Sequence, residues 1–297
     1  MEKFSPIEKH IHQSLDIPLS PYLQDHRFMG NAVFPAVEAM EILAESAQSL
    51  VPEICVRHIR DAAFDRFLLI PPGLKSIPVI HDMEIRESEI VSRLITRIHS
   101  EKTGITRVRE HVRLHFCTNE SPAMPQNMTF EMPEMSDAKD CFEISCERIY
   151  AELVPFGPAY QNITGSLILT EKQAVATVRG CPDHFDFMAD FPEDFSNRSL
   201  GSPFAADGAF HAACAWGQRY AGIVAFPVGI GARHIFCATG MNELYKAFCI
   251  PVKYDANILI FNIYLYDLRG NLCEIMQNLH MRDISRGRMK APEWIRI

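Results

Sequence analysis

The stretch that decides the fold reads Asp25-His26-Arg27-Phe28-Met29-Gly30-Asn31-Ala32-Val33-Phe34-Pro35. A helical pattern of apolar residues follows directly, spaced by three or four positions: Ala36, Met40, Leu43, Ala47 and Leu50. This spacing predicts a helix with one buried face. Pro35 suits the start of such a helix, where a missing N–H costs nothing. The stretch therefore predicts a histidine, His26, held just before a buried helix.

A second helix is expected over residues 203–220, which are apolar on nearly every side, as in a helix enclosed by a curved sheet. Asp207 and His211 are ionisable exceptions, and their spacing of four puts them on one helix face. Burying an ionisable group is costly unless it is paired or faces a cleft. The two residues are therefore either a structural pair or part of a site. With His26, the chain offers the base and the acid that an elimination needs.

Composition excludes several classes of function. The formal net charge of -8 argues against a nucleic-acid partner, because such partners are bound by clustered Lys and Arg. No run approaches the roughly 18 apolar residues that span a bilayer, and the N-terminus lacks the apolar core of a signal peptide, so we expect a cytoplasmic protein without membrane contact. Nine cysteines without a CxxC pair favour reduced thiols and predict no metal site. The basic residues near the C-terminus form either a solvated tail or a docking patch: Arg282, Arg286, Arg288, Lys290 and Arg296.

The chain looks like two similar halves joined by a linker. Residues 117–138 contain three prolines and many Ser, Asn and Met residues, which suit neither a helix nor a strand. We place the boundary there, giving halves of 1–138 and 139–297. Each half has one helix followed by strand patterns and a charged, glycine-closed hairpin, which predicts an α+β fold. The expected strands are 54–67, 75–84, 89–100 and 106–116, then 144–153, 165–169, 173–179, 226–237, 243–250, 255–267 and 272–282.

These residues resemble a known family. His26, Gly30 and Pro35 fit the HxxxGxxxxP motif of the dehydratase domains of polyketide synthases and polyunsaturated fatty acid synthases, and Asp207 with His211 fits their DxxxQ/H motif. Three further segments resemble family motifs in the same order: residues 157–161 the GYxYGPxF segment, 227–231 a Pro- and Gly-containing strand, and 266–270 the closing hairpin. The resemblance therefore covers the whole chain.

The resemblance implies a double hot-dog fold, with two antiparallel sheets each wrapped around a central helix and one substrate tunnel between them. It implies dehydration of a 3-hydroxyacyl thioester on an acyl carrier protein to a 2-enoyl thioester. His26 is then the base, a protonated Asp207 in apolar surroundings is the acid, and His211 orients Asp207. Backbone N–H groups near Gly30 and the helix start are expected to stabilise the enolate.

No cofactor is expected beyond the phosphopantetheine arm of the carrier. The partners implied are the acyl carrier protein and other synthase domains, and a homodimer is left open because family members often pair. The expected substrate-binding residues are Gly30, Pro35, Phe28, Phe34, Phe156, Gly157, Pro158 and Tyr160, and Met29 and Phe210 are either chain contacts or core.

The chain also departs from the family. Val154 and Phe156 stand where GYxYGPxF has tyrosines, so the hydroxyl that supports the aspartate is either supplied by Tyr150 or Tyr160 or is absent. Three other functions remain open: a double-bond isomerase using the same His26 and Asp207, a product-template cyclisation domain, and a non-catalytic module that binds a carrier protein.

Overall fold

Antiparallel strands from both halves of the chain form one continuous sheet. The computed structural model describes residues 7–100, 104–117, 141–181, 198–241, 243–255 and 258–297. Within these, twelve strands pair in the order β1-β5-β6-β7-β4-β11-β14-β13-β12-β10-β9-β8. The first-half strands are β1 (Ile7–Pro18), β4 (His58–Ala63), β5 (Ser76–Arg86), β6 (Glu89–Ser100) and β7 (Ile105–Cys117). The second-half strands are β8 (Phe142–Ser145), β9 (Ile163–Thr170), β10 (Gln173–Arg179), β11 (Phe226–Ile235), β12 (Leu244–Tyr254), β13 (Leu259–Asp267) and β14 (Leu272–Arg282).

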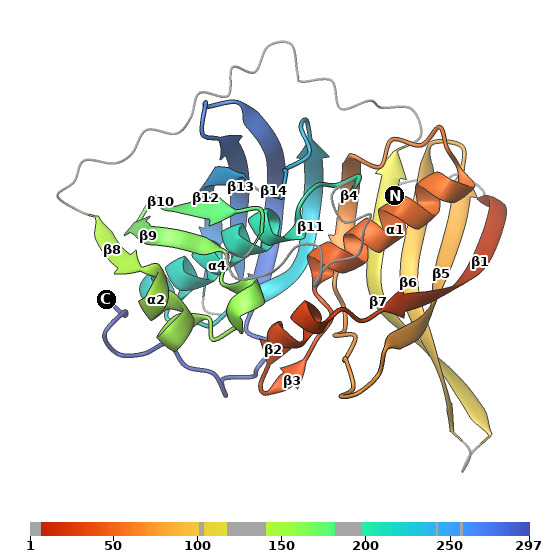
Figure 1. The fold of residues 1–297 in the computed structure, drawn as a ribbon, viewed down its shortest axis with the longest axis horizontal. Helices are drawn as coiled ribbons and strands as arrows, with labels where there is room; N and C mark the ends of the chain where they lie inside the picture. The colour runs from red at the N-terminus through yellow and green to blue at the C-terminus, as the bar shows by residue number, and fades with distance from the viewer. Residues whose placement is uncertain (1–6, 101–103, 118–140, 182–197, 242, 256–257) are drawn as a thin grey trace.

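Helix α1 (Ala36–Leu50) lies across the first half and contacts β5, β6 and β7 (Figure 1). The apolar residues at spacings of three and four face the sheet, and Met40, Leu43 and Ala47 are fully buried. The helix begins after Pro35, which takes the capping position one residue before the first turn. The sequence pattern therefore located both the helix and its buried face.

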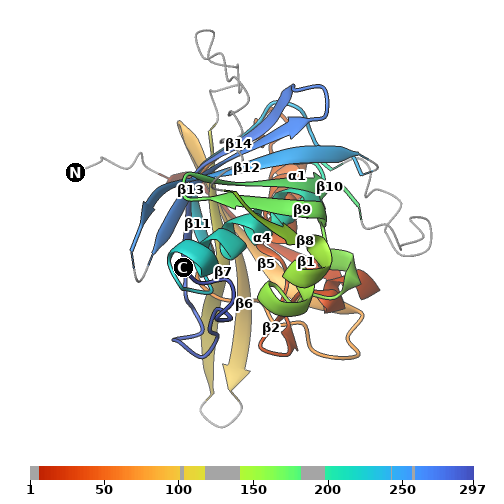
Figure 2. The same cartoon turned by 90° about the vertical axis from the view of Figure 1, so that its left-hand side faces the viewer.

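Helix α4 (Pro203–Tyr220) lies inside the curve of the second-half strands (Figure 2). Every residue from Pro203 to Gln218 is buried. Small residues let the strands approach closely: a Cβ on Gly208 would lie 3.0 Å from Val178 Cγ1. The helix that was apolar on nearly every side is thus a helix enclosed by its sheet, as predicted.

The two halves meet where β4 pairs with β11, with Ala62 opposite Ile230 and Ile59 opposite Arg233. Gly229 is required here, because a side chain at this position would meet the Ala62 carbonyl oxygen. Residues from both halves also share one hydrophobic core cluster. The predicted α+β double hot-dog architecture is confirmed, and the two expected sheets are joined edge to edge into one.

Some local predictions were wrong. Residues 144–153 are mostly helical rather than extended: after β8 come α2 (Cys146–Arg148) and a π-helical turn, η3 (Ile149–Leu153). The buried residues Ile149, Tyr150 and Leu153 have helical spacing, which strand alternation does not explain. Strand β1 was missed because it is an edge strand exposed over most of its length. The domain boundary at residue 138 lies outside the described residues.

Short elements precede α1 in the first half and β9 in the second half. They are a 3-10 turn, η1 (Pro21–Asp25), a small hairpin of β2 (Arg27–Phe28) and β3 (Asn31–Ala32), and a 3-10 turn in the second half, η4 (Pro158–Tyr160). None of the helices in the described part of the chain has the length and apolarity to cross a membrane.

Candidate active site

His26 is held by its own backbone hairpin. Its Nδ1 lies 2.9 Å from the carbonyl oxygen of Val33, and the Val33 N–H donates to the His26 carbonyl at 2.9 Å. A carbonyl oxygen only accepts hydrogen bonds, so the ring proton of neutral His26 is on Nδ1. The turn that returns the chain to Val33 contains Met29 and Gly30, both with positive φ (48° and 82°). Gly30 therefore shapes a hairpin, and Nε2 of His26 is left with a free lone pair.

Two aromatic rings fix the plane of the His26 imidazole. The Phe156 ring centroid lies 4.6 Å from that of His26, and Tyr160 meets it edge-on at 5.0 Å. Burial lowers the pKa of His26 below its ordinary value, and the nearby Asp207 carboxylate offsets this only in part. His26 is therefore neutral at pH 7, the form that can accept a proton.

Asp207 and His211 lie one turn apart on α4, with Oδ2 and Nε2 2.9 Å apart. The two atoms are close enough for an ion pair but poorly aligned for a hydrogen bond, and neither has another hydrogen-bond partner among the described residues. His211 Nδ1 lies 3.2 Å from the hydroxyl of Tyr150, which itself accepts the N–H of Ile163 at 2.7 Å. Tyr150 therefore orients His211, and His211 orients Asp207.

The surroundings of Asp207 act against the protonated form that was expected from the sequence. Burial acts to raise its pKa, but His211 and His26 together outweigh burial, and the pKa lies below the ordinary value. Apolar surroundings were expected to keep this carboxyl group protonated near neutral pH. Two imidazoles beside it, His211 more than His26, have the opposite effect and hold the pKa of Asp207 below its ordinary value.

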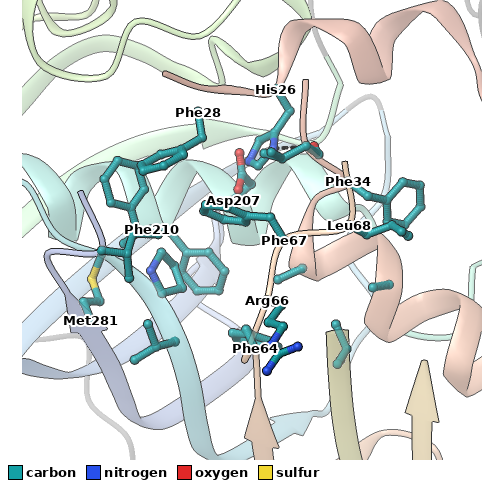
Figure 3. Close-up of a pocket in the computed structure, with 18 of the residues that line it drawn as sticks. His26, Phe28, Phe34, Phe64, Arg66, Phe67, Leu68, Asp207, Phe210 and Met281 are labelled. Carbon is teal, nitrogen blue, oxygen red and sulfur yellow. Dashed lines mark hydrogen bonds between the residues drawn. The ribbon is translucent and has the colours of Figure 1, made fainter. Parts of the chain in front are cut away.

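His26 and Asp207 line one cavity of about 430 Å³ between the two halves, together with His211. Figure 3 shows the Asp207 carboxylate pointing toward the His26 ring, with Phe28 and Phe210 on one side and Phe34 and Leu68 on the other. Most of the wall is apolar, and it includes Phe64, Phe67 and Met281. An imidazole from the first half and a carboxylate from the second thus line the same apolar cavity.

The residues expected to bind substrate divide into two groups. Phe28, Phe34 and Phe156 line the cavity, as does Phe210. Of the described residues expected at the site, five lie outside the cavity wall: Gly30, Pro35, Gly157, Pro158 and Tyr160. Met29 is likewise not part of the wall and is exposed in its turn.

Gly157 and Pro158 instead belong to a contact between the halves. The Gly157 N–H donates to the Asp25 carbonyl at 2.9 Å, and the Ala159 N–H donates to the Asp25 carboxylate at 2.9 Å. A Cβ on Gly157 would collide with the Asp25 side chain. The glycine therefore lets the segment that carries Phe156 dock beside His26.

The sequence did not connect the basic side chains at the rim of the cavity with the site, although it marked Arg282 as part of a solvated tail or a docking patch. Three exposed arginines from separate elements contribute to the cavity wall: Arg27, Arg66 and Arg282. Arg66 lies in the segment predicted to be a strand up to residue 67, which in fact ends at Ala63, and Figure 3 shows its side chain at one end of the cavity. Only the fold brings these arginines together, because they are far apart in the sequence.

The structure closely resembles solved dehydratase domains of polyketide synthases. An N-terminal dehydratase from the difficidin assembly line matches with a TM-score of 0.70 and 12% identity, covering 94% of this chain and 95% of that one. The dehydratase domain of the CurF module of the curacin polyketide synthase matches with a TM-score of 0.70 and 18% identity over 95% and 96% of the two chains. That of PpsC from Mycobacterium tuberculosis, in complex with C12:1-CoA, matches with a TM-score of 0.66 and 17% identity over 93% and 94%. The chain therefore has the dehydratase-domain fold over nearly its full length.

Sequence comparison gives a weaker signal in the same direction. No protein-family model matches the chain. A hybrid polyketide synthase and non-ribosomal peptide synthetase, pynA of Aspergillus niger, is 27% identical over 206 residues. The match covers 65% of this chain but only 5% of that much longer protein. The similarity is thus to one segment of a multidomain synthase.

Proposed function

We propose that this chain, which has the fold of polyketide synthase dehydratase domains, removes water from a 3-hydroxyacyl thioester to give a 2-enoyl thioester. The observation that carries the proposal is the placement of His26 and Asp207 in one apolar cavity, from opposite halves. An elimination needs a base for the carbon next to the carbonyl and an acid for the departing oxygen, and a carbon chain needs an apolar enclosure. One cavity offers all three.

His26 is the base in this proposal. Its Nε2 takes the proton from the carbon next to the thioester carbonyl, while Nδ1 stays hydrogen-bonded to Val33 and keeps the ring oriented. The enolate oxygen needs donors. The N–H groups of Val33 and Phe34 are already used by the carbonyls of His26 and Leu68, so the donors come from the first turn of α1, where Ala36 lines the cavity.

Asp207 is the acid, and it must first gain a proton. Substrate binding expels water and covers the carboxylate with apolar surface, which raises its pKa toward that of a protonated acid. Asp207 then gives its proton to the 3-hydroxyl oxygen, the carbon–oxygen bond breaks and water leaves. The proton taken by His26 then passes to Asp207, which regenerates the protonated acid. When the product leaves, Asp207 releases to solvent the proton that it took up on substrate binding, so the cycle closes with no net gain or loss of protons.

The substrate is proposed to arrive on the phosphopantetheine arm of an acyl carrier protein. Three arginines at the cavity suit a phosphate group, because guanidinium groups bind phosphate in a bidentate manner. A related fold has been solved with C12:1-CoA, an acyl thioester that also carries a phosphorylated pantetheine arm. The similarity to one segment of a multidomain synthase supports a place beside other synthase domains. The cytoplasm is the proposed location, and a homodimer stays open.

A double-bond isomerase is the second candidate, and one observation favours it. His211 Nε2 lies 2.9 Å from Asp207 Oδ2 and acts to lower the pKa of that carboxyl group. Moving a proton between carbons through His26 does not require a protonated carboxyl group. One of the solved structures with a similar fold is an inactive variant of the CurJ dehydratase, in which phenylalanine replaces a histidine. Both candidates depend on His26, whereas only dehydration also needs the proton of Asp207.

The test is turnover of a 3-hydroxyacyl carrier thioester and of a 2-enoyl carrier thioester, followed by mass spectrometry. Dehydration predicts loss of one water by the parent protein and a fall of about 10³-fold or more in His26→Ala and Asp207→Asn. His99→Ala, at the exposed end of β6 where it pairs with β7, is the matched control and is expected to keep full turnover. Product of unchanged mass with a moved double bond would instead establish the isomerase, and carrier binding without any turnover would leave only the binding module.

A further inference from the structure

Two histidines and an aspartate converge on the outer face of the first-half sheet, away from the cavity. His10 and His12 are two residues apart on β1, so both side chains point to the same face. In the β1–β5 pair, His12 lies opposite Asp82 and His10 opposite Glu84. Since β1 is the edge strand of the sheet, both imidazoles are open to solvent, with 44% and 50% of their side chains exposed.

The three side chains aim at one point. His10 Nε2 lies 2.5 Å from Asp82 Oδ1, and His12 Nδ1 lies 2.9 Å from the same oxygen. The two imidazole rings are 4.4 Å apart between centroids. All three donor atoms lie within 4.8 Å of one another. Two nitrogen donors and one carboxylate oxygen therefore meet at a single solvent-facing position.

This spacing fits a bound transition-metal ion. Zinc binds histidine nitrogen and carboxylate oxygen at about 2.0–2.2 Å, which puts tetrahedral donors roughly 3.3 Å apart. The two nitrogens need to move away from Asp82 by less than about 1 Å to reach that separation. Exposed side chains on an edge strand can make such a move by rotation, and water can complete the coordination.

The second carboxylate oxygen of Asp82 is held from behind. Arg93 Nη1 lies 3.1 Å from Asp82 Oδ2 and 2.8 Å from Glu84 Oε1, and Arg93 Nε lies 3.6 Å from Glu110. One guanidinium group is thus shared among three carboxylates and fixes the direction of Asp82. Hydrogen-bonded support of this kind orients a carboxylate ligand toward a metal.

The surrounding charges leave room for a cation. The network also includes Arg86, which pairs with Glu84 and Glu89, and Arg113, which pairs with Glu110. Four carboxylates, Asp82, Glu84, Glu89 and Glu110, therefore face three guanidinium groups. Arg60 also acts on Glu89, so the four carboxylates offset the guanidinium groups around them, and the positive charge of Arg93 does not exclude a bound cation.

We propose that His10, His12 and Asp82 bind one divalent transition-metal ion, of which zinc is the best fit. Two imidazoles and one carboxylate are ligands that zinc accepts, with one position left for water. The ion joins β1 to β5 and so fastens the edge strand to the sheet. This site is separate from the cavity and does not depend on the proposed function.

The experiment is a titration of the whole chain with zinc, followed by calorimetry and thermal unfolding, and with cobalt, followed by visible absorption. The parent protein is expected to bind one ion at this site and to gain thermal stability. His12→Ala and His10→Ala are expected to weaken binding about tenfold or more and to remove the stabilisation. Both histidines are exposed, so these variants are expected to fold, and His99→Ala is the matched control for an exposed histidine on the same sheet.

Cobalt separates this site from the nine cysteines, because thiolate ligands give intense charge-transfer bands and imidazole with carboxylate does not. Bands of that kind, or equal binding by the parent protein and His12→Ala, would place the ion elsewhere and overturn the proposal. Absence of any zinc-dependent stabilisation in the parent protein would overturn it as well.

Discussion

Helices α1 and α4 hold equivalent places in the two halves, but they use their polar residues differently. On α1, Ser46 Oγ contacts His81 Nδ1 at 2.7 Å and Gln13 at 2.9 Å, which ties the helix to its own sheet. On α4, Asp207 and His211 face the cavity, and the helix packs closely on β10 through Gly208. The buried polar groups of α1, including Glu38, which pairs with Arg198, join that helix to its surroundings, whereas the buried Asp207 and His211 of α4 line the candidate cavity.

The same contrast separates the two candidate catalytic groups. His26 lies outside either helix and is fixed by the Val33 carbonyl and aromatic rings, and its pKa is lowered by burial. Asp207 lies within α4, and although burial acts to raise its pKa, the imidazoles of His211 and His26 hold the pKa below its ordinary value. The lowered pKa of His26 favours the neutral imidazole that a base needs, while the lowered pKa of Asp207 disfavours the protonated carboxyl group that an acid needs. The carboxylate side of the site is therefore the more sensitive to change.

Among the residues that support His26 and Asp207, the largest effect is expected from His211→Leu, which removes the imidazole beside Asp207. Turnover should fall about 10³-fold, because Asp207 loses the group that orients it. The pKa of Asp207 should rise, because the imidazole that lowered it is gone, and the alkaline limb of the kcat profile should move to higher pH. A pH series of kcat and KM measures both effects.

His211→Gln is the control, since an amide N–H can replace the imidazole N–H toward Asp207. It should keep turnover within about tenfold of the parent protein. If the leucine variant turned over as fast as the glutamine variant, His211 would have no part in positioning Asp207.

The next effect is on stability and concerns the polar contact under α1. His81 is buried between Ser46 and Ser92, and burial lowers its pKa to about 4. As pH falls below about 6.5, the unfolded chain binds a proton at this residue that the folded chain does not. The free energy of unfolding should therefore fall by about 3 kcal/mol between pH 6.5 and 4 from this group alone.

The measurement is urea unfolding at several pH values for the parent protein and for His81→Gln, compared as a difference. The difference matters because Glu41, whose pKa is raised to about 7 by burial, acts in the opposite direction. Its folded form keeps a proton that the unfolded chain releases above pH 4.5, so this group makes the protein less stable as pH rises toward 7. A difference that does not change with pH would show that His81 titrates alike in both states.

A smaller effect is expected from Tyr150→Phe, which tests the outermost support of Asp207. The variant loses the hydroxyl that accepts the Ile163 N–H and contacts His211, while the ring remains. We expect kcat to fall about tenfold with little change in KM, because Tyr150 does not line the cavity. Tyr220→Phe, at the partly exposed end of α4, is the control and should leave kcat unchanged. Equal kcat values in the two variants would remove Tyr150 from the chain of support.

The sequence predicted the two helices and most of the strands because their periodicity is strong. Met40, Leu43 and Ala47 recur at helical spacing, and the strands from β5 to β7 are rich in β-branched residues. It failed at β1, where an exposed edge strand carries little apolar alternation, and at residues 146–153, where buried positions follow a helical period over less than three turns. Short and exposed elements take their form from the neighbours they pair with, and those are not visible in the sequence.

The sequence indicated His26, Asp207 and His211 as candidates, and they line one cavity. It did not give the direction in which the pKa of Asp207 shifts, because the sequence does not show that the His211 imidazole lies 2.9 Å from the carboxylate, with His26 of the other half also nearby. Nor did it separate Phe156, which lines the cavity, from Gly157, which makes room for Asp25. Adjacent residues took different roles because the backbone contact with Asp25 turns the chain there.

The smallest effect is expected from Gly208→Ala, which tests how closely α4 packs. The added Cβ would lie 3.0 Å from Val178 Cγ1 and 3.2 Å from Asn162 Cβ, tighter than ordinary contact. Overpacking costs roughly 1–3 kcal/mol, and the better helix propensity of alanine returns about 1 kcal/mol, so the net loss should be about 1 kcal/mol. On α1, the fully buried positions 44 and 47 already hold alanine, so that helix accommodates a Cβ at its buried face. The cost of adding a Cβ is therefore expected only at α4. In a double-mutant cycle with Val178→Ala, the two changes should compensate in part, because Val178→Ala removes Cγ1, the nearest of the atoms that the new Cβ would meet. Additive losses of unfolding free energy in urea would mean that the residues around α4 adjust to the added Cβ without help from Val178→Ala. Close packing would then not distinguish α4 from α1.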